Sequence, residues 1–300
     1  MLARIRLAPL IARVALVALA GCALALAGCG GGAGAPKTTA AGPAKFAGHG
    51  TRAASAAPVR TAPAPVPALI PPPGAPARSV RVPVLTYHRV APISAVGQPD
   101  LKVDPANFAA ELAALQHAGY HTIRQAQLFD ALYRGGALPS KPIIISADDG
   151  YVDDVRTMLP DLQRLHMVAT FFVITGRMSE PGFLSADQIR ELDRASMDVG
   201  DHTAHHLDLR LLAPSELQAE TAGSKRVLEA VLGHPVYYFA YPFGTHNDAV
   251  VSALHASGFT LAYTTAGGIT ESTSAPLTMP RLHVGRDETP SGLVSLLGGA

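Results

Sequence analysis

The sequence contains no tryptophan, and its only two cysteines, Cys22 and Cys29, lie within the first 30 of its 300 residues. The rest of the chain therefore has no disulfide and no thiolate metal site, which excludes zinc ribbons and cysteine nucleophiles there. Charge is also sparse, since 16% of the residues are charged and the formal net charge is +1. Because nucleic-acid-binding proteins usually carry a basic face, we expect no nucleic-acid partner.

The first 29 residues have the pattern of an export signal. A positive start is followed by an apolar stretch over residues 14–27 and then by small residues. This stretch is shorter than the roughly 20 apolar residues that a membrane-spanning helix needs. The positive charges at the start are those of Arg4, Arg6 and Arg13.

The end of this segment, Leu26-Ala27-Gly28-Cys29, resembles the lipobox of bacterial lipoproteins. In that family the cysteine becomes the lipidated first residue of the mature protein, so the resemblance implies lipidation of Cys29. A second match ends at Cys22, but the apolar run before it is shorter. We expect an exported lipoprotein of the bacterial cell envelope, anchored to a membrane through its acyl chains, or a secreted protein if the lipobox is not used.

Residues 30–81 are rich in alanine, proline, glycine and threonine and have almost no periodic apolar pattern. Such a segment cannot bury enough apolar surface to offset the entropy lost on ordering. We therefore predict a disordered tether over residues 30–81, followed by a single folded domain over residues 82–300.

In this domain, short apolar runs alternate with amphipathic segments, which predicts a parallel sheet with crossover helices and hence an α/β fold. The apolar runs are continuous, as expected for strands covered on both faces. The predicted strands are residues 83–87, 142–147, 169–175, 197–200, 236–240 and 259–264. The predicted helices are residues 105–117, 153–166, 185–195, 214–232 and 247–257.

Two short segments carry side chains suited to chemistry, each directly after a predicted strand. Residues 148–150 read Asp-Asp-Gly, and residues 202–206 read His-Thr-Ala-His-His. One carboxylate and two imidazoles can hold a divalent metal and leave positions open for water and substrate. The second carboxylate is then free to act as a base. Adjacent acids also cap helices, and paired histidines also lie on surfaces, but together the two segments indicate a metal-assisted hydrolase.

These segments resemble two motifs of the polysaccharide deacetylase family, also called the NodB-homology or carbohydrate esterase family 4 domain. Residues 146–150 are similar to its Thr-Phe-Asp-Asp-Gly motif and residues 202–206 to its His-Ser/Thr-x-x-His motif. The resemblance extends over roughly residues 82–286 and implies a distorted parallel (β/α) barrel with a single catalytic domain. It implies that Asp148 is the general base and that the metal ligands are Asp149, His202 and His206. It places His205 off the ligand pattern, as a non-liganding loop residue.

These three ligands do not determine the identity of the metal. Two histidines and one aspartate suit zinc, and nickel or cobalt would also fit.

The third motif departs from the family. Its common form is Arg-x-Pro-Tyr, whereas residues 239–244 read Phe-Ala-Tyr-Pro-Phe-Gly, with Ala240 in place of the arginine. That arginine braces the base in the family, and Arg281 could supply its charge from another strand end, or it could be an ordinary surface arginine. By resemblance, the backbone N–H near Phe243 is the oxyanion donor.

Two histidines are candidates for the catalytic acid. Leu282-His283 is similar to the family's last motif. Tyr87-His88 is similar to a Tyr-His pair after the first strand in the branch that deacetylates poly-β-1,6-N-acetylglucosamine of biofilms, a branch that also carries the Tyr-Pro-Phe/Tyr-Gly variant. We favour His88 over His283, although either could be a structural histidine.

The resemblance therefore implies metal-dependent N-deacetylation of a polysaccharide that contains N-acetylglucosamine, with release of acetate. The motif variants favour poly-β-1,6-N-acetylglucosamine over peptidoglycan or chitin, and we expect Tyr151, Tyr241 and Phe243 to line a sugar groove. Two alternatives stay open. One is a hydrolase of a small amide on the same scaffold, against which the export signal argues. The other is a non-catalytic, sugar-binding envelope lipoprotein, which the Ala240 replacement would permit.

Overall fold

The computed structural model describes residues 68–95 and 97–298 of the chain. The predicted export signal, the lipidation of Cys29 and most of the predicted tether lie outside these residues. Among the described helices, none combines the length and the hydropathy that a bilayer span requires.

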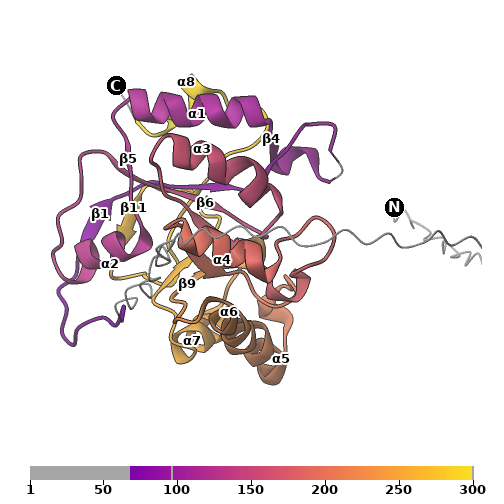
Figure 1. Cartoon of the computed structure of the whole chain (residues 1–300). Helices are drawn as coiled ribbons and strands as arrows, with labels where there is room; N and C mark the ends of the chain where they lie inside the picture. Colours follow the sequence, from indigo (N-terminus) through magenta and orange to yellow (C-terminus); the bar gives the residue numbers. More distant parts are fainter. Residues whose placement is uncertain (1–67, 96, 299–300) are drawn as a thin grey trace, which may run out of the picture. The chain divides into compact units, whose positions relative to one another are not determined.

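A curled parallel sheet forms the centre of the domain (Figure 1). Its order is β10-β9-β8-β7-β6-β2-β12, with β5 beside β6, and every pairing in it is parallel. The predicted α/β class is thus confirmed, and the sheet curls into a half-barrel, which is consistent with the predicted distorted parallel (β/α) barrel. The strands are β2 (Val84–Tyr87), β5 (His121–Thr122), β6 (Pro142–Ala147), β7 (Thr170–Val173), β8 (Asp198–Asp201), β9 (Tyr238–Ala240), β10 (Leu261–Tyr263) and β12 (Leu282–His283).

One segment contacts both edges of this sheet. Met279 forms a parallel bridge with Tyr263 of β10, and a few residues later β12 pairs with β2. Residues 279–283 therefore curl the sheet by bringing its first and last strands toward each other.

The strands are apolar on both faces because helices or strands cover both. In β6, Ile143 and Ile145 belong to one buried cluster, whereas Ile144 belongs to the other. The expectation from the continuous apolar runs is therefore confirmed.

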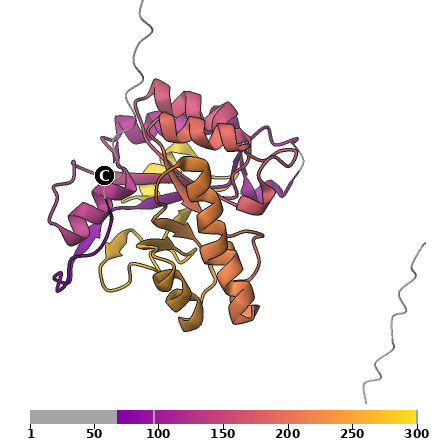
Figure 2. The same ribbon diagram turned by 60° about the horizontal axis from the view of Figure 1, so that its bottom comes forward.

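Helices surround the sheet (Figures 1 and 2), and α1 and α8 lie side by side. Asp104 caps the first helix by accepting a hydrogen bond from the backbone N–H of Ala106, and Ser185 forms a capping box with Gln188, as their sequence signals indicate. The helices are α1 (Pro105–His117), α2 (Gln125–Tyr133), α3 (Leu159–Arg164), α4 (Ala186–Arg194), α5 (Pro214–Gln218), α6 (Ser224–Leu232), α7 (Asp248–Ala256) and α8 (Pro290–Leu296).

Two predicted helices are interrupted by π-helical turns. Residues 153–166 were expected to form one helix, but the turn Asp154–Met158 precedes α3. Similarly, the turn Ala219–Gly223 lies between α5 and α6. A π turn inserts one residue into the helical repeat, and such turns are frequent at functional sites. The second turn buries Glu220, which the site uses below.

The folded part begins earlier than predicted. Residues 68–81 were assigned to the tether, but Leu69 is buried and β1 (Ser79–Arg81) pairs antiparallel with β11 (Thr270–Ser272). The predicted boundary at residue 81 is therefore wrong. Pairing with a strand almost 200 residues away is not visible in local composition. The sequence also missed α2, α8, β5, β12, β3 (Arg89–Val90) and β4 (Lys102–Val103).

Glu271, in the middle of β11, is a fully buried acid, and neither of its carboxylate oxygens has a hydrogen-bond partner among the described residues. Burial raises its pKa from the usual 4.5 to about 8. Between these two values the folded protein keeps a proton that the unfolded chain releases. The free energy of unfolding is therefore largest below the unfolded pKa and falls as the pH rises toward 8.

Glu271→Gln should flatten this pH dependence, because glutamine is neutral at every pH. The slope of the unfolding free energy should decrease by up to about 1.4 kcal/mol per pH unit. Calorimetric Tm values at several pH values between about 5 and 9 measure this slope. Glu191→Gln, at an exposed position on α4, is the matched control. If the control flattens the pH dependence equally, or if Glu271→Gln does not flatten it, the pH dependence does not come from the raised pKa of Glu271.

Candidate active site

Side chains from the carboxyl ends of the parallel strands surround a cleft of about 890 Å³. This is the usual place for a site in a parallel α/β fold, since the loops that follow the strands meet there. The cleft brings together most of the residues that the sequence singled out, namely His88, Asp148, Asp149, His202, His206, Phe243 and His283. Arg281 is not among the cleft-lining residues, and it lies behind Asp148.

Asp149, His202 and His206 form a cluster that could hold a metal ion. Each offers one ligand atom, and these atoms all lie within 4.8 Å of one another. The Oδ1 atom of Asp149 is 3.5 Å from Nε2 of His202 and 3.6 Å from Nε2 of His206. Two imidazoles and one carboxylate are a common ligand set for a catalytic zinc that keeps a position open. The residues therefore fit a divalent cation.

The backbone around these ligands is held in unusual conformations. Asp149 and His206 have φ angles of 76° and 57°, in the left-handed region that non-glycine residues seldom adopt. The backbone N–H of His206 donates to Oγ1 of Thr203, which also has a positive φ. Such strain persists only where surrounding contacts enforce it, and it is concentrated at functional sites.

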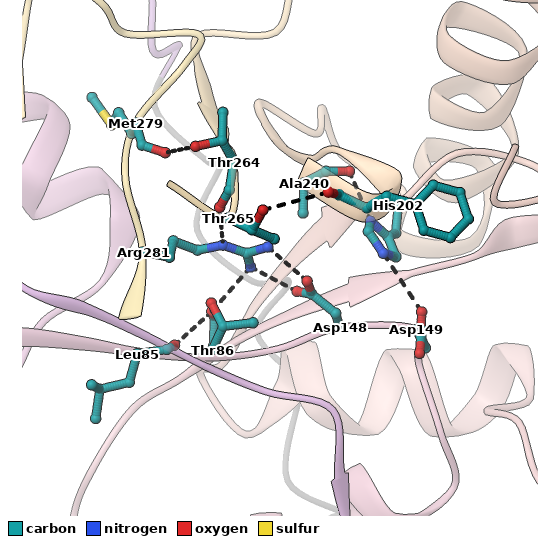
Figure 3. A network of polar contacts seen from close by, with 12 residues as sticks. Leu85, Thr86, Asp148, Asp149, His202, Ala240, Thr264, Thr265, Met279 and Arg281 are labelled. Carbon is teal, nitrogen blue, oxygen red and sulfur yellow. Dashed lines mark hydrogen bonds and ion pairs between the residues drawn. The ribbon is translucent and has the colours of Figure 1, made fainter. Parts of the chain in front are cut away.

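The ring of His202 is oriented by the sheet. Its Nδ1 donates a hydrogen bond to the backbone oxygen of Ala240 at 2.7 Å, because a carbonyl can only accept. This leaves the lone pair on Nε2, the atom nearest Asp149 (Figure 3). Burial lowers the pKa of His202 to about 3 and also lowers that of His206, so both rings are neutral, as metal ligands must be.

Asp148 is held by a two-pronged ion pair with Arg281, in which both N–O distances are 2.7 Å (Figure 3). Burial is the largest single influence on the pKa of Asp148 and would raise it. The charge and hydrogen bonds of Arg281, together with the nearby His202 and His88, outweigh burial and hold the pKa well below its usual range. Arg281 is 2% exposed, so the alternative of a surface arginine is wrong. Arg281 directly precedes β12, so it lies at the start of a strand, and its long side chain reaches Asp148 from there.

Both candidate acids lie in the cleft. The rings of His88 and His283 are 5.5 Å apart between their centroids. Burial lowers the pKa of His88 to about 4 and lowers that of His283 as well. The Nδ1 atom of His88 has no hydrogen-bond partner among the described residues.

The loop after β9 carries Phe243 into the cleft with a φ of 58°. The next residue must be glycine, because a Cβ at Gly244 would lie 2.1 Å from Oγ1 of Thr265. The Phe243 ring is 60% exposed and packs edge-on against His206 at a centroid distance of 4.7 Å. An aromatic ring is thus exposed directly beside the metal-ligand cluster.

All three aromatic residues expected in a sugar groove line the cleft. Tyr241 is almost fully buried, however, and its hydroxyl donates to the backbone oxygen of Leu277, so it supports the wall. Tyr151 stacks on Phe183 at 4.8 Å, and it lies close enough to Asp149 for each group to shift the pKa of the other. The sequence had not indicated this link between Tyr151 and a candidate metal ligand.

His205 lies outside the metal-ligand cluster, as expected, and its partner is Glu220. Sequence reasoning missed Glu220, which stands within a predicted amphipathic helix with no motif around it.

A model of the polysaccharide deacetylase family matches residues 135–262 of the chain. A polysaccharide deacetylase from Bacillus cereus is 30% identical, with a TM-score of 0.66 over 73% of this chain and 69% of that one. The deacetylase PplD of Streptococcus pyogenes, solved in complex with acetate, is 26% identical, with a TM-score of 0.68 over 73% of this chain and 99% of that one. IcaB of Ammonifex degensii is 26% identical, with a TM-score of 0.65 over 72% and 96% of the two chains.

Proposed function

This chain belongs to the polysaccharide deacetylase family, hydrolases of amide bonds in polysaccharides, and from that premise we propose that it deacetylates poly-β-1,6-N-acetylglucosamine in a metal-dependent reaction. The main support for this reaction is the Arg281–Asp148 ion pair, which lies beside the cluster of Asp149, His202 and His206. The preference for this polysaccharide over chitin or peptidoglycan is supported by the Tyr87-His88 pair and by the Tyr-Pro-Phe-Gly form of the third motif.

Asp149, His202 and His206 would hold the cation, for which zinc is the best candidate and nickel or cobalt are alternatives. When bound, a divalent cation supplies Lewis-acid polarisation of an amide carbonyl and of water. Asp148 lies next to this position and, because Arg281 keeps it ionised, accepts the proton of the attacking water.

Other residues of the same cleft carry out the remaining steps. The backbone N–H of Phe243 stabilises the negative charge that develops on the amide oxygen. His88 passes a proton to the departing nitrogen, with His283 as the alternative acid, and because its pKa is about 4 it holds this proton only transiently during turnover. The products are acetate and a glucosamine unit with a free amine.

The non-catalytic alternative depended on the missing arginine at position 240. The guanidinium of Arg281 lies beside the proposed base carboxylate, where it can supply the charge that the family arginine normally supplies, and this supports turnover over simple sugar binding. The small-amide alternative is weakened by the predicted export signal, because a soluble metabolite needs no display at the cell surface.

We further propose that the enzyme is exported and anchored to a membrane of the cell envelope through lipidated Cys29, with residues 30–67 as a tether. Incorporation of labelled palmitate by the full-length chain, lost in Cys29→Ser, would support this location. Incorporation that persists in Cys29→Ser would contradict it.

The reaction is tested by acetate release from poly-β-1,6-N-acetylglucosamine oligomers by the full-length enzyme. We expect release to be lost on chelation and to return when zinc is added, because Asp149, His202 and His206 are the cluster suited to hold a cation within the described part of the chain. The same panel with chitin and peptidoglycan fragments tests the substrate. Release from peptidoglycan alone would replace the proposed substrate, and release that persists after verified metal removal would refute the metal-dependent reaction.

A further inference from the structure

One histidine of the cleft has no role in the proposed reaction. His205 lines the cleft directly beside the candidate ligand His206, and its side chain is 68% exposed. It does not belong to the metal-ligand cluster. An exposed histidine ordinarily has a mobile side chain, but this one is fixed in place.

Glu220 fixes His205 through both of its carboxylate oxygens. One oxygen is 2.6 Å from Nδ1 of His205, and the other accepts the backbone N–H of His205 at 2.8 Å. Because a carboxylate can only accept, Nδ1 carries the proton and the lone pair of the neutral ring is on Nε2. The side chain of Glu220 is 5% exposed. A buried carboxylate is costly, and here one of its oxygens orients the exposed ring while the other holds the backbone of the same residue.

The same ring is confined from the other side by Gly176. A Cβ at position 176 would lie 3.1 Å and 3.2 Å from two atoms of the His205 ring and 2.4 Å from the backbone oxygen of Ala204. The backbone N–H of Gly176 donates to that oxygen at 2.8 Å. A side chain here would displace the ring, so the glycine leaves room for the position in which Glu220, on the π-helical turn, holds it.

The wall beside His205 is polar and ordered. Arg177 and Glu180 both line the cleft and form an ion pair at 3.1 Å. Arg177 also stacks over the ring of Phe183 at 3.9 Å. Polar groups held in fixed positions in a cleft provide specificity, because little entropy is lost when a ligand binds them.

We propose that His205 is a specificity-determining residue, whose Nε2 accepts a hydrogen bond from a hydroxyl of the bound polysaccharide. This inference rests on the proposed function and deepens it, since it requires an unsubstituted sugar hydroxyl at that place in the substrate. Glu220 is a positioning residue that acts through His205.

His205→Ala should raise the KM for a poly-β-1,6-N-acetylglucosamine oligomer by about tenfold, the equivalent of one hydrogen bond, and change kcat by less than about twofold. Glu220→Ala should have nearly the same effect, and the double variant should lose little more, because both changes remove one contact. Glu220→Gln, which still accepts a hydrogen bond, should restore part of the affinity. His255→Ala, an exposed histidine on α7, is the matched control.

Two further measurements separate substrate recognition from structural damage. Bound zinc and the hydrolysis of p-nitrophenyl acetate, which has no sugar, should be unchanged in His205→Ala. The inference would be overturned if His205→Ala lost its zinc, if its activity toward p-nitrophenyl acetate fell as much as its activity toward the oligomer, or if its KM for the oligomer were unchanged.

Oligomer binding to Asp148→Asn, followed by calorimetry, distinguishes this inference from the proposed function. If the double variant Asp148→Asn/His205→Ala binds the oligomer more weakly than Asp148→Asn does, the role of His205 is supported. This holds even if the wild-type enzyme releases no acetate and the proposed reaction fails. Equal binding, or no binding by either protein, refutes the role of His205.

Discussion

Asp148→Asn is expected to lower acetate release by about 10²–10⁴-fold, the usual contribution of a general base. The change keeps the size of the side chain but removes its ability to take the proton of the attacking water. Asp149, His202 and His206 are untouched, so the variant should still bind zinc. Retained metal with lost activity is the result that identifies Asp148 as the base.

The same substitution should destabilise the fold, because it leaves Arg281 buried opposite a neutral amide. Removal of one partner of a buried ion pair typically costs about 3–5 kcal/mol. Kinetics must therefore be measured well below the Tm of the variant. Asp153→Asn, which breaks the neighbouring ion pair with Arg89 at 2.7 Å, is the matched control and should retain activity. If Asp148→Asn had activity near the wild-type level, Asp148 would not be the general base.

The sequence predicted the sheet and the metal cluster because both depend on local patterns. Continuous apolar runs such as residues 142–147 are typical of strands buried on both faces, and their short length favours a strand over a helix. Residues that directly follow parallel strands meet at one edge of the sheet, so two motifs more than 50 residues apart could be placed in one site. Capping residues such as Asp104 and Ser185 marked helix starts for the same local reason.

The remaining features depend on contacts between distant parts of the chain. The π-helical turn that buries Glu220 leaves no trace in an amphipathic pattern, since a single inserted residue shifts the repeat only slightly. The pairing of β1 with β11 joins segments that share no motif. The role of Arg281 could be stated only as a hypothesis, because the curl of the sheet alone decides whether its side chain reaches Asp148.

Arg281→Met should reduce kcat by about 10–100-fold, the usual cost of removing a group that supports a metal-site residue. Methionine keeps the length of the side chain but cannot donate to either oxygen of Asp148. Without the guanidinium, the pKa of Asp148 rises, so the acidic limb of the pH–rate profile should move to higher pH. Arg281→Lys keeps the charge but makes fewer hydrogen bonds, so its kcat should lie between those of the wild-type enzyme and of Arg281→Met.

Arg281→Met should also lower the free energy of unfolding by about 3–5 kcal/mol, because Asp148 is then buried without its partner. The double variant Asp148→Asn/Arg281→Met removes both charges and should be more stable than either single variant. Denaturant unfolding of all four proteins gives the coupling energy of the pair. Additive losses of stability, or an unchanged pH–rate profile in Arg281→Met, would mean that Arg281 fills space behind the base without controlling its charge.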